Sequence, residues 1–391
     1  MNILLSNISL VYPAGSELYT KDLAKYLSSK GHSVTVFSTA LGPIAEEINR
    51  IKNVSVTNNL EEIKDKKFDV LHIHHNVNAY LLREYFPKTP AIMVIHGVLP
   101  EYEQPPRMDL GISQYIAVSE EVRDHLMKEY DIPKSKIEVI YNWVNKKKFA
   151  KKSEINPAPK SLLVISNHLS SEQEEIYKSV CREKGIEYLH IGLPDNPVFN
   201  VEDYINKADI IVTIGRGAIE SIMCGRNVII SDIYGIDGML TPTLYSESMK
   251  NNLSGRRFGK KLTKEIFEEE LGKYSVSNAK EMQKIVMHNH NREQNIQKII
   301  SLYIKIKNDN VRVDKNFNKT ILEIKTLARL NGMREVYIYN LEERLSKASI
   351  DLDSLKNQNR EINDKLSAYR DSKLVKLGEK YRDLKSKIIK H

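Results

Sequence analysis

The sequence has very little cysteine and no long uninterrupted hydrophobic run. Cys181 and Cys224 are the two cysteines in 391 residues, too few for a disulfide framework or a thiolate metal site, which indicates a reducing compartment. No apolar run approaches the roughly 20 residues that a membrane-spanning helix needs. The opening MNILLSNISL also lacks the basic stretch of a signal peptide. We therefore expect a cytoplasmic protein, or one at the inner face of the cell membrane.

The charge is unbalanced toward basic residues. The chain has 59 Lys and Arg against 51 Asp and Glu, which gives a formal net charge of +8. Such a balance favours anionic partners without separating phosphate-bearing substrates from anionic lipids. The basic residues show no aromatic interleaving and no nucleic-acid-reading module, so we do not expect a nucleic-acid partner.

Short apolar runs alternate with helical patterns along the first three quarters of the chain. Examples of the runs are NILLSNISLVY, HSVTVFST, AIMVIHG, SLLVIS and DIIVTIG. Alternation of this kind predicts βαβ units, and nearly continuous Ile, Val and Leu is typical of parallel strands buried on both faces. The lysine- and proline-containing stretch KKKFAKKSEINPAPKS separates two such sets. The sequence therefore predicts an α/β protein with two Rossmann-like, doubly wound domains at residues 1–150 and 151–310.

A helical extension is predicted for residues 311–391. From Ile338, apolar or small residues recur at alternating spacings of three and four up to Tyr369, with Asn359 at one inward position. This heptad pattern predicts a coiled coil over about residues 336–370, and hence a homo-oligomer, or else a long helix folded back on its own body. Residues 372–391 hold seven Lys or Arg and two acidic residues on an amphipathic pattern. That tail either contacts a membrane surface or is an ordinary solvated helix end.

The stretch GRGAIESIMCGRNVIISD carries the strongest chemical signal. It places Gly215, Arg216, Gly217 and Glu220 between two predicted strands of the second domain. In doubly wound sheets, ligands bind beyond the carboxyl ends of strands, where N–H groups at a helix start accept phosphate oxygens. The glycines would admit an anion to the backbone, Arg216 would add a charged contact, and Glu220 could hold a ribose diol. Glu220 could equally be an ordinary carboxylate near a helix start.

The segment AIESIMCGRNVIISD resembles the nucleotide-sugar-binding segment of GT-B fold glycosyltransferases of the retaining group 1, family 4-like type. YPAGSELYTKDLAKYLSSKGHSVTVFST is similar to the opening of that family, with its turn at Gly15 and Ser16. SNHLSSE and NNLSGRR resemble a subgroup with related Ser-Asn and Asn-x-x-Gly-Arg signatures. The resemblance covers about residues 1–305. It implies a donor site formed by the turns at residues 15–16, 167–168 and 215–220.

The resemblance also implies a role for His96, which would face the donor sugar as a catalytic residue together with Glu220. His96 could instead be a packed histidine at the end of its strand. Asn167 and His168 stand where the family usually has Arg and Lys, so phosphate neutralisation would depend on Arg216, a backbone turn or the pair Arg256 and Arg257. Val212 replaces the usual first glutamate of the family's donor motif.

Three histidines in LHIHHN, at positions 72, 74 and 75, raise the question of a metal. No carboxylate or cysteine joins them locally, and the resembling enzymes need no metal in their fold, so we expect none. The predicted function is transfer of a sugar from a nucleotide-diphosphate sugar, with no bound cofactor, to a glycan or lipid-linked acceptor in surface polysaccharide or glycoconjugate synthesis. Two alternatives stay open: a nucleotide-sugar 2-epimerase-like isomerase, and a catalytically degenerate GT-B subunit that assembles through its coiled coil.

Overall fold

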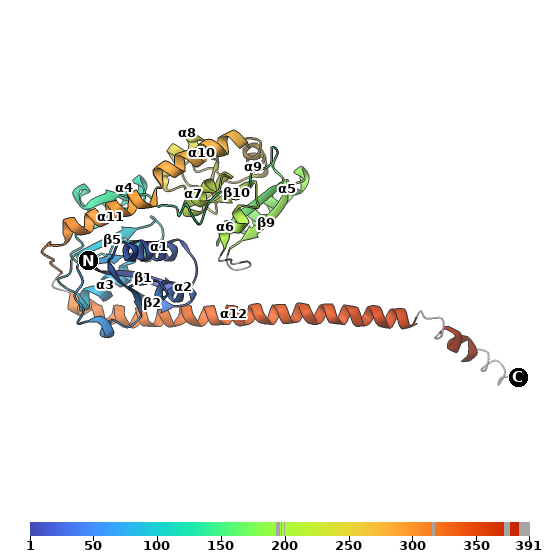
Figure 1. Ribbon diagram of the computed structural model, residues 1–391, viewed down its shortest axis with the longest axis horizontal. Helices are drawn as coiled ribbons and strands as arrows, with labels where there is room; N and C mark the ends of the chain where they lie inside the picture. The colour runs from blue at the N-terminus through green and yellow to red at the C-terminus, as the bar shows by residue number, and fades with distance from the viewer. Residues whose placement is uncertain (193–195, 197, 199, 315–316, 371–375, 383–391) are drawn as a thin grey trace. The chain divides into compact units, whose positions relative to one another are not determined.

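The computed structural model describes residues 1–192, 196, 198, 200–314, 317–370 and 376–382. The described chain divides into two compact units, Met1–Gly332 and Met333–His391. The first unit contains two β-sheets with helices around them, and a long helix, α12, runs from it into the second unit (Figure 1). The predicted pair of Rossmann-like sheets followed by a helical extension is therefore confirmed. None of the described helices combines the length and the apolar character needed to cross a bilayer.

The first sheet is entirely parallel, with strand order β3-β2-β1-β4-β5-β6-β7. This is the order of a dinucleotide-binding sheet with one added strand, and its topological switch point lies between β1 and β4. Its strands are β1 Asn2–Leu10, β2 Ser33–Leu41, β3 Val54–Thr57, β4 Val70–Ile73, β5 Ala91–Ile95, β6 Gln114–Ala117 and β7 Ile137–Val139. Its connecting helices are α1 Gly15–Ser29, α2 Pro43–Asn49, α3 Asn76–Tyr85 and α4 Glu120–Glu129.

The second sheet has the order β12-β11-β10-β8-β9, with β12 antiparallel at one edge. Its switch point lies between β8 and β10. The strands are β8 Ser161–Ile165, β9 Glu187–Ile191, β10 Ile210–Thr213, β11 Asn227–Asp232 and β12 Gly235–Met239. The helices are α5 Ser171–Lys184, α6 Val201–Ile205, α7 Gly215–Met223, α8 Pro242–Ser248, α9 Lys264–Leu271 and α10 Val276–Asn289.

A buried carboxylate fixes the connection between the two sheets. Asp209, just before β10, accepts hydrogen bonds from the backbone N–H groups of Asn156, Lys160 and Ser161 at 2.9, 2.8 and 3.2 Å. Burial opposes ionisation of this carboxyl, but the hydrogen bonds prevail and lower its pKa. The predicted linker thus enters β8 in a defined position beside β10, which sets the switch point of the second sheet.

The chain returns to the first sheet after completing the second. Helix α11, Arg292–Ile306, buries Ile296, Ile299 and Tyr303 in the same hydrophobic core as the strands of the first sheet. Helix α12, Phe317–Arg370, begins on that core through Phe317 and Ile321. The apolar residues of each helix indicate a buried face, but the core that receives this face is set by the tertiary structure.

Candidate functional site

A cavity of about 360 Å³ lies at the switch point of the second sheet. It opens between the carboxyl ends of β8 and β10 and the turn that precedes α1, which is where doubly wound sheets bind ligands. Among the residues that line it are seven of the predicted site residues: Gly15, Asn167, His168, Gly215, Arg216, Gly217 and Glu220. Ser16 and His96, also predicted, are not among its lining residues.

The start of α7 forms one wall of this cavity. Glycine is needed at two positions there, at one because of the backbone conformation and at the other because of a close contact. Gly215 has φ +54°, a left-handed conformation that favours glycine, and its N–H donates to Leu253 O at 2.9 Å. A Cβ at Gly217 would lie 2.6 Å from Oγ1 of Thr213. The Thr213 hydroxyl is itself committed, because it donates to Ile165 O at 3.0 Å. Both glycines are therefore required for the chain to turn from β10 into a helix that starts at the cavity.

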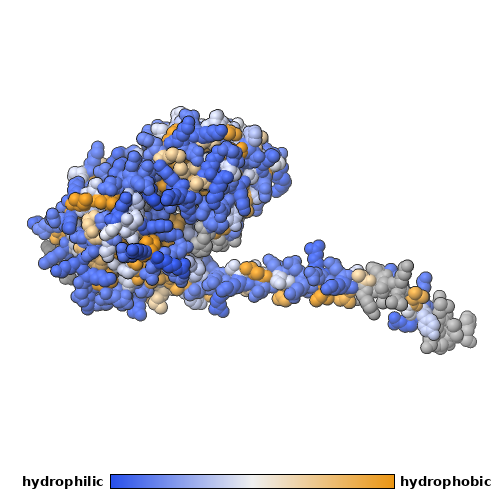
Figure 2. Space-filling view, viewed as in Figure 1, coloured by the Kyte–Doolittle hydropathy of each residue, from blue (hydrophilic) through white to orange (hydrophobic). Residues whose placement is uncertain are grey.

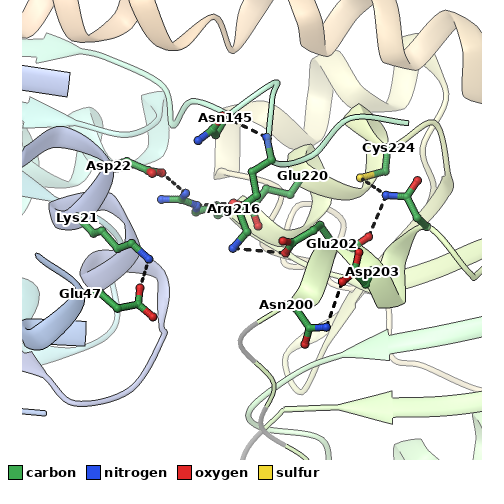
Figure 3. Close-up of polar contacts among 12 residues, drawn as sticks. Lys21, Asp22, Glu47, Asn145, Asn200, Glu202, Asp203, Arg216, Glu220 and Cys224 are labelled. Carbon is green, nitrogen blue, oxygen red and sulfur yellow. Dashed lines mark hydrogen bonds and ion pairs between the residues drawn. The ribbon is translucent and has the colours of Figure 1, made fainter. Parts of the chain in front are cut away.

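Arg216 is held by two carboxylates, one from each sheet's domain (Figure 3). Its Nε donates to Glu220 Oε1 at 2.7 Å within α7, and its Nη2 donates to Asp22 Oδ2 on α1. The three side chains are only 13, 7 and 15% exposed for Arg216, Glu220 and Asp22. The guanidinium is thus the centre of a mostly buried ion triad, and Arg216 and Glu220 of this triad line the cavity.

The triad contains two carboxyl groups and one guanidinium. Burial by itself would lower the pKa of Arg216, but Glu220 and Asp22 outweigh burial and raise it, so the guanidinium stays charged. Burial raises the pKa of Glu220, and Arg216 opposes that shift. A phosphate group that binds the guanidinium would therefore compete with Glu220 and Asp22, both of which already pair with it.

The remaining residues predicted for the nucleotide-sugar site lie in the turn after β8 and at the start of α1. Asn167 and His168 follow β8, and the His168 N–H donates to Ser166 Oγ at 3.1 Å. Ser16 stands in the first turn of α1, where its hydroxyl donates to Glu17 Oε2 at 2.9 Å. The structure brings the β8 turn and the α7 turn to one cavity, and Ser16 lies beside this group without lining the cavity.

His96 belongs to a cluster of aromatic rings at the carboxyl ends of β4 and β5. Its Nε2 lies 2.7 Å from Nδ1 of His74, and the two rings stack at 5.0 Å. Tyr19 meets the His96 ring edge-on at 5.2 Å. Burial, with a smaller effect of Arg216, lowers the pKa of His96 to about 4. His96 is therefore neutral near pH 7, where it can exchange hydrogen bonds with a sugar hydroxyl but does not hold a proton for general acid catalysis.

His72 and His75 of LHIHHN form hydrogen bonds with residues of α11 and β1. His72 Nδ1 pairs with Tyr303 OH at 2.7 Å, and His75 Nδ1 accepts from Ile8 N–H at 3.1 Å. Among the residues that the structure describes, no group of three or more His, Cys, Asp or Glu side chains is arranged to hold a metal ion. Burial lowers the pKa of His72 and of His75 to about 3.

The alternative phosphate contacts raised by the sequence are paired elsewhere. Arg256 Nη2 donates to Glu121 Oε2 of α4, and Arg257 Nη2 donates to Glu247 Oε2 of α8, both at 2.9 Å. Val212 lies inside β10 at 1% exposure, in the core between the sheet and its helices. Of the cationic side chains proposed for phosphate, Arg216 is the one that lines the cavity.

Sequence reasoning missed Asp22, which lies 194 positions from its partner Arg216. Nothing in the local pattern of α1 distinguishes this aspartate from the other polar residues of the helix. It also missed Thr213 and Asp232, which line the cavity from the ends of β10 and β11. These two could have been found, because each ends a predicted strand at the ligand-binding edge.

Glu103 is a second carboxyl group with an unusual environment. Glu103 is the last residue of a short 3-10 helix, Glu101–Glu103. Its Oε2 would lie 3.5 Å from a Cβ atom placed on Gly97. Burial raises its pKa to about 7 from an ordinary value of 4.5. The folded protein therefore binds a proton here that the unfolded chain releases above about pH 4.5, so this group stabilises the fold at low pH and loses that effect as the pH rises through 7.

We expect Glu103→Gln to remove this pH dependence. The amide keeps the shape of the protonated carboxyl, so the variant should unfold at a higher temperature than the wild type at pH 8. Near pH 4.5 the two proteins should unfold at nearly the same temperature. Thermal unfolding monitored by circular dichroism across that pH range measures the difference, and an offset that is equal at both ends would contradict the assignment.

Comparison with known proteins gives a family match for the first domain. Residues 13–148 match the model of Glycosyltransferase Family 4. No protein with a curated description matches the chain. A glycosyltransferase from Rickettsia africae ESF-5 is similar in structure, with a TM-score of 0.55 and 18% identity over 79% of this chain and 99% of that one.

Two further solved structures are similar at lower scores. The glycosyltransferase of kitacinnamycin has a TM-score of 0.49 at 13% identity and covers 77% of this chain and 98% of its own. An α-glucosyltransferase in complex with UDP and a 13-mer DNA has a TM-score of 0.48 at 11% identity and covers 78% and 99%. The first domain thus matches Glycosyltransferase Family 4, and the chain has the two-sheet GT-B fold of glycosyltransferases.

Proposed function

We propose that this protein is a glycosyltransferase that moves a sugar from a nucleotide-diphosphate sugar to a glycan or lipid-linked acceptor. The observation that carries the proposal is the cavity at the β8/β10 switch point, where Gly215, Arg216 and Glu220 meet the turn at Gly15. Its position beyond the carboxyl ends of parallel strands is the usual place for a nucleotide in a doubly wound sheet. The match of residues 13–148 to a glycosyltransferase family supports the same reaction class.

The chemistry proposed for the cavity is mainly electrostatic. When a sugar leaves its nucleoside diphosphate, negative charge grows on the departing phosphate, and preorganised donors stabilise that charge. The start of α7 offers the positive end of a helix dipole, and Arg216 offers a guanidinium. Glu220, four residues further along α7, offers carboxylate oxygens for the two ribose hydroxyls. No metal or bound cofactor takes part in this proposal; the nucleotide sugar is the substrate.

The acceptor would approach from the first domain. His96 lies at the carboxyl end of β5 in the first domain, and Arg216 of the second domain is close enough to lower its pKa. We therefore propose that His96, as a neutral imidazole, exchanges a hydrogen bond with the transferred sugar. Retention of anomeric configuration is part of the proposal and is supported by the resemblance to the retaining group 1 enzymes. A role in surface polysaccharide synthesis at the inner face of the cell membrane is supported by the basic sequence of residues 372–391.

The direct test is a panel of UDP-, GDP-, ADP- and CMP-sugars in a thermal-unfolding assay on the full chain. A ligand that binds only the native state at 100 times its Kd stabilises it by about 2.7 kcal/mol. We expect one nucleotide to raise the unfolding midpoint, and the corresponding sugar nucleotide to be consumed when an acceptor is supplied. Epimerised donor without acceptor would support the isomerase instead, and no response to any nucleotide at saturation would support a degenerate subunit.

A further inference from the structure

The C-terminal part of α12 is a helix with no covered face in a single chain. Every described residue from 341 to 368 is exposed. Isolated helices in water are only marginally stable, and most helices in proteins are stabilised by packing of an apolar face. A helical segment of this length is therefore expected to have a partner surface.

An apolar stripe runs along this segment. In Figure 2, apolar side chains recur along one edge of the long helix. Written as heptads, the stripe has its a positions at Ile338, Leu345, Leu352, Asn359 and Leu366, and its d positions at Leu341, Ala348, Leu355 and Ile362. The leucines are 41–71% exposed in the single chain, with Leu341 the least and Leu345 the most.

We propose that residues 338–366 of two copies of this chain form a parallel, in-register, two-stranded coiled coil. The spacing supports a second helix rather than a flat protein surface as the occupant. A strict seven-residue repeat drifts by about 20° per heptad on a straight α-helix, so the stripe stays continuous only when two helices supercoil around each other. The stripe keeps this period through four complete heptads, from Ile338 to Leu366.

Asn359 decides the direction and the register. In a parallel, in-register pair, an a position faces its own copy, so the two Asn359 amides can hydrogen-bond to each other. In an antiparallel pair, an a position packs beside d positions of the partner, and every d position here from Leu341 to Ile362 is apolar. The Asn359 amide would then be buried without a partner, which is unfavourable. A single polar residue at an a position is also typical of a two-stranded coil with a fixed register.

One pair of opposite charges beside the stripe agrees with this arrangement. Asp351 occupies a g position, and Lys356, five residues later, occupies the following e position. Those are the two positions that face each other between the helices of a parallel coiled coil. In the single chain both flank the seam, and Lys356 contacts Asp353 on its own helix at 3.1 Å. Two symmetric Asp351–Lys356 pairs would form in the dimer.

Such a dimer has a consequence for the end of the chain. In a parallel coil both copies of the basic segment 372–391 leave from the same end, and each has a net charge of +5 by sequence. Two linked basic segments bind an anionic surface far more strongly than one, because the second contact becomes intramolecular.

The test measures the mass of the full-length protein by sedimentation velocity at several concentrations. We expect twice the chain mass of 45.0 kDa for the wild type. Leu352→Asp places a charge in the apolar stripe, between the two helices, and should shift the mass to that of one chain. Ile350→Asp is the matched control: Ile350 is an apolar residue that is 67% exposed, against 53% for Leu352, but it lies at an f position, away from the apolar stripe. This control should stay dimeric.

The parallel orientation of the two helices is tested by introducing one cysteine near the start of the coiled coil. Leu341→Cys faces its own copy only in a parallel pair, and the two native cysteines are buried. Mild oxidation should therefore give a covalent dimer in nearly full yield. A single-chain mass for the wild type, a mass of three chains, or equal behaviour of the two aspartate variants would overturn the two-stranded coil. A dimer that fails to cross-link at residue 341 would overturn its parallel direction.

Discussion

Glu220→Ala is expected to weaken nucleotide-sugar binding by about ten- to a hundredfold. Hydrogen bonds to a charged group contribute about 1.5–3 kcal/mol each, and about 1.4 kcal/mol corresponds to a factor of ten in affinity. In the proposed site the Glu220 carboxylate accepts from the ribose hydroxyls, and alanine has no acceptor to replace it. The loss should be larger for the intact nucleotide than for inorganic diphosphate, which has no ribose. Isothermal titration calorimetry with the nucleotide identified in the thermal panel measures both.

A neighbouring carboxylate supplies the control for this substitution. Glu202, at the start of α6, pairs with Lys148 at 3.4 Å and is not among the residues lining the cavity. Glu202→Ala should change nucleotide affinity by less than about threefold, since it removes one partly buried ion pair whose two residues do not line the cavity. Glu220→Gln keeps the size of the side chain and separates lost charge from lost packing. If Glu220→Ala and Glu220→Gln both bound the nucleotide as tightly as the wild type, the ribose role of Glu220 would be wrong.

Asp22→Asn is expected to act in the opposite direction and to raise nucleotide affinity about tenfold. Asp22 and Glu220 both pair with the guanidinium of Arg216. A diphosphate has to compete with Asp22 for the guanidinium. The apparent affinity of a ligand is its intrinsic affinity multiplied by the fraction of protein molecules in the binding-competent state. The neutral amide introduced by Asp22→Asn would weaken the hold of this position on Arg216, which leaves the guanidinium freer to bind the phosphate.

The free protein should lose stability in the same variant, because removing one partner of a mostly buried ion pair is destabilising. Glu47→Gln is the matched control. Glu47 pairs with Lys21, the residue before Asp22 on α1 (Figure 3). Neither Glu47 nor Lys21 is among the residues that line the cavity, and their side chains are about twice as exposed as those of Arg216 and Asp22. Replacement of Glu47 should leave nucleotide affinity unchanged. If Asp22→Asn weakened binding as Glu220→Ala does, Asp22 would support the binding geometry instead of competing with the ligand.

The opposite signs of these two variants separate the donor site from a purely structural ion triad. A structural triad predicts that either substitution lowers stability and that neither changes nucleotide affinity in a specific direction. The proposed donor site predicts one loss and one gain, measured on the same ligand. The coiled coil is independent of both, since its test uses only the mass of the protein.

Local patterns were enough to predict the two sheets and the turns that end their strands. The run DIIVTIG followed by GRGAIE signals a buried strand and then a helix start, because hydrophobic period and glycine position are properties of adjacent residues. Parallel strands end at one edge of a sheet, so the turns at Asn167 and Gly215 could be expected to meet. They do meet, in the cavity at the β8/β10 switch point.

The partners of several side chains could not be read from the sequence. The apolar face of α11 predicts burial but does not identify the first sheet as the core that receives Tyr303. The pattern LHIHHN is compatible with a metal site or with packed histidines, and only the positions of His96 and Tyr303 show how two of its rings are held. The pairing of Arg216 with Asp22 joins residues 194 positions apart.

Sequence patterns were sufficient for the α/β class, the two sets of mainly parallel strands, the glycine turn of α7 and the long C-terminal helix, because each depends on residues close together in the chain. The tertiary structure alone decided that Arg216 is bound by Asp22, that His96 is a neutral member of a buried ring cluster, and that α11 belongs to the first core. Those contacts depend on how elements distant in sequence pack, and a side chain's charge or apolar character does not specify which distant surface it will meet.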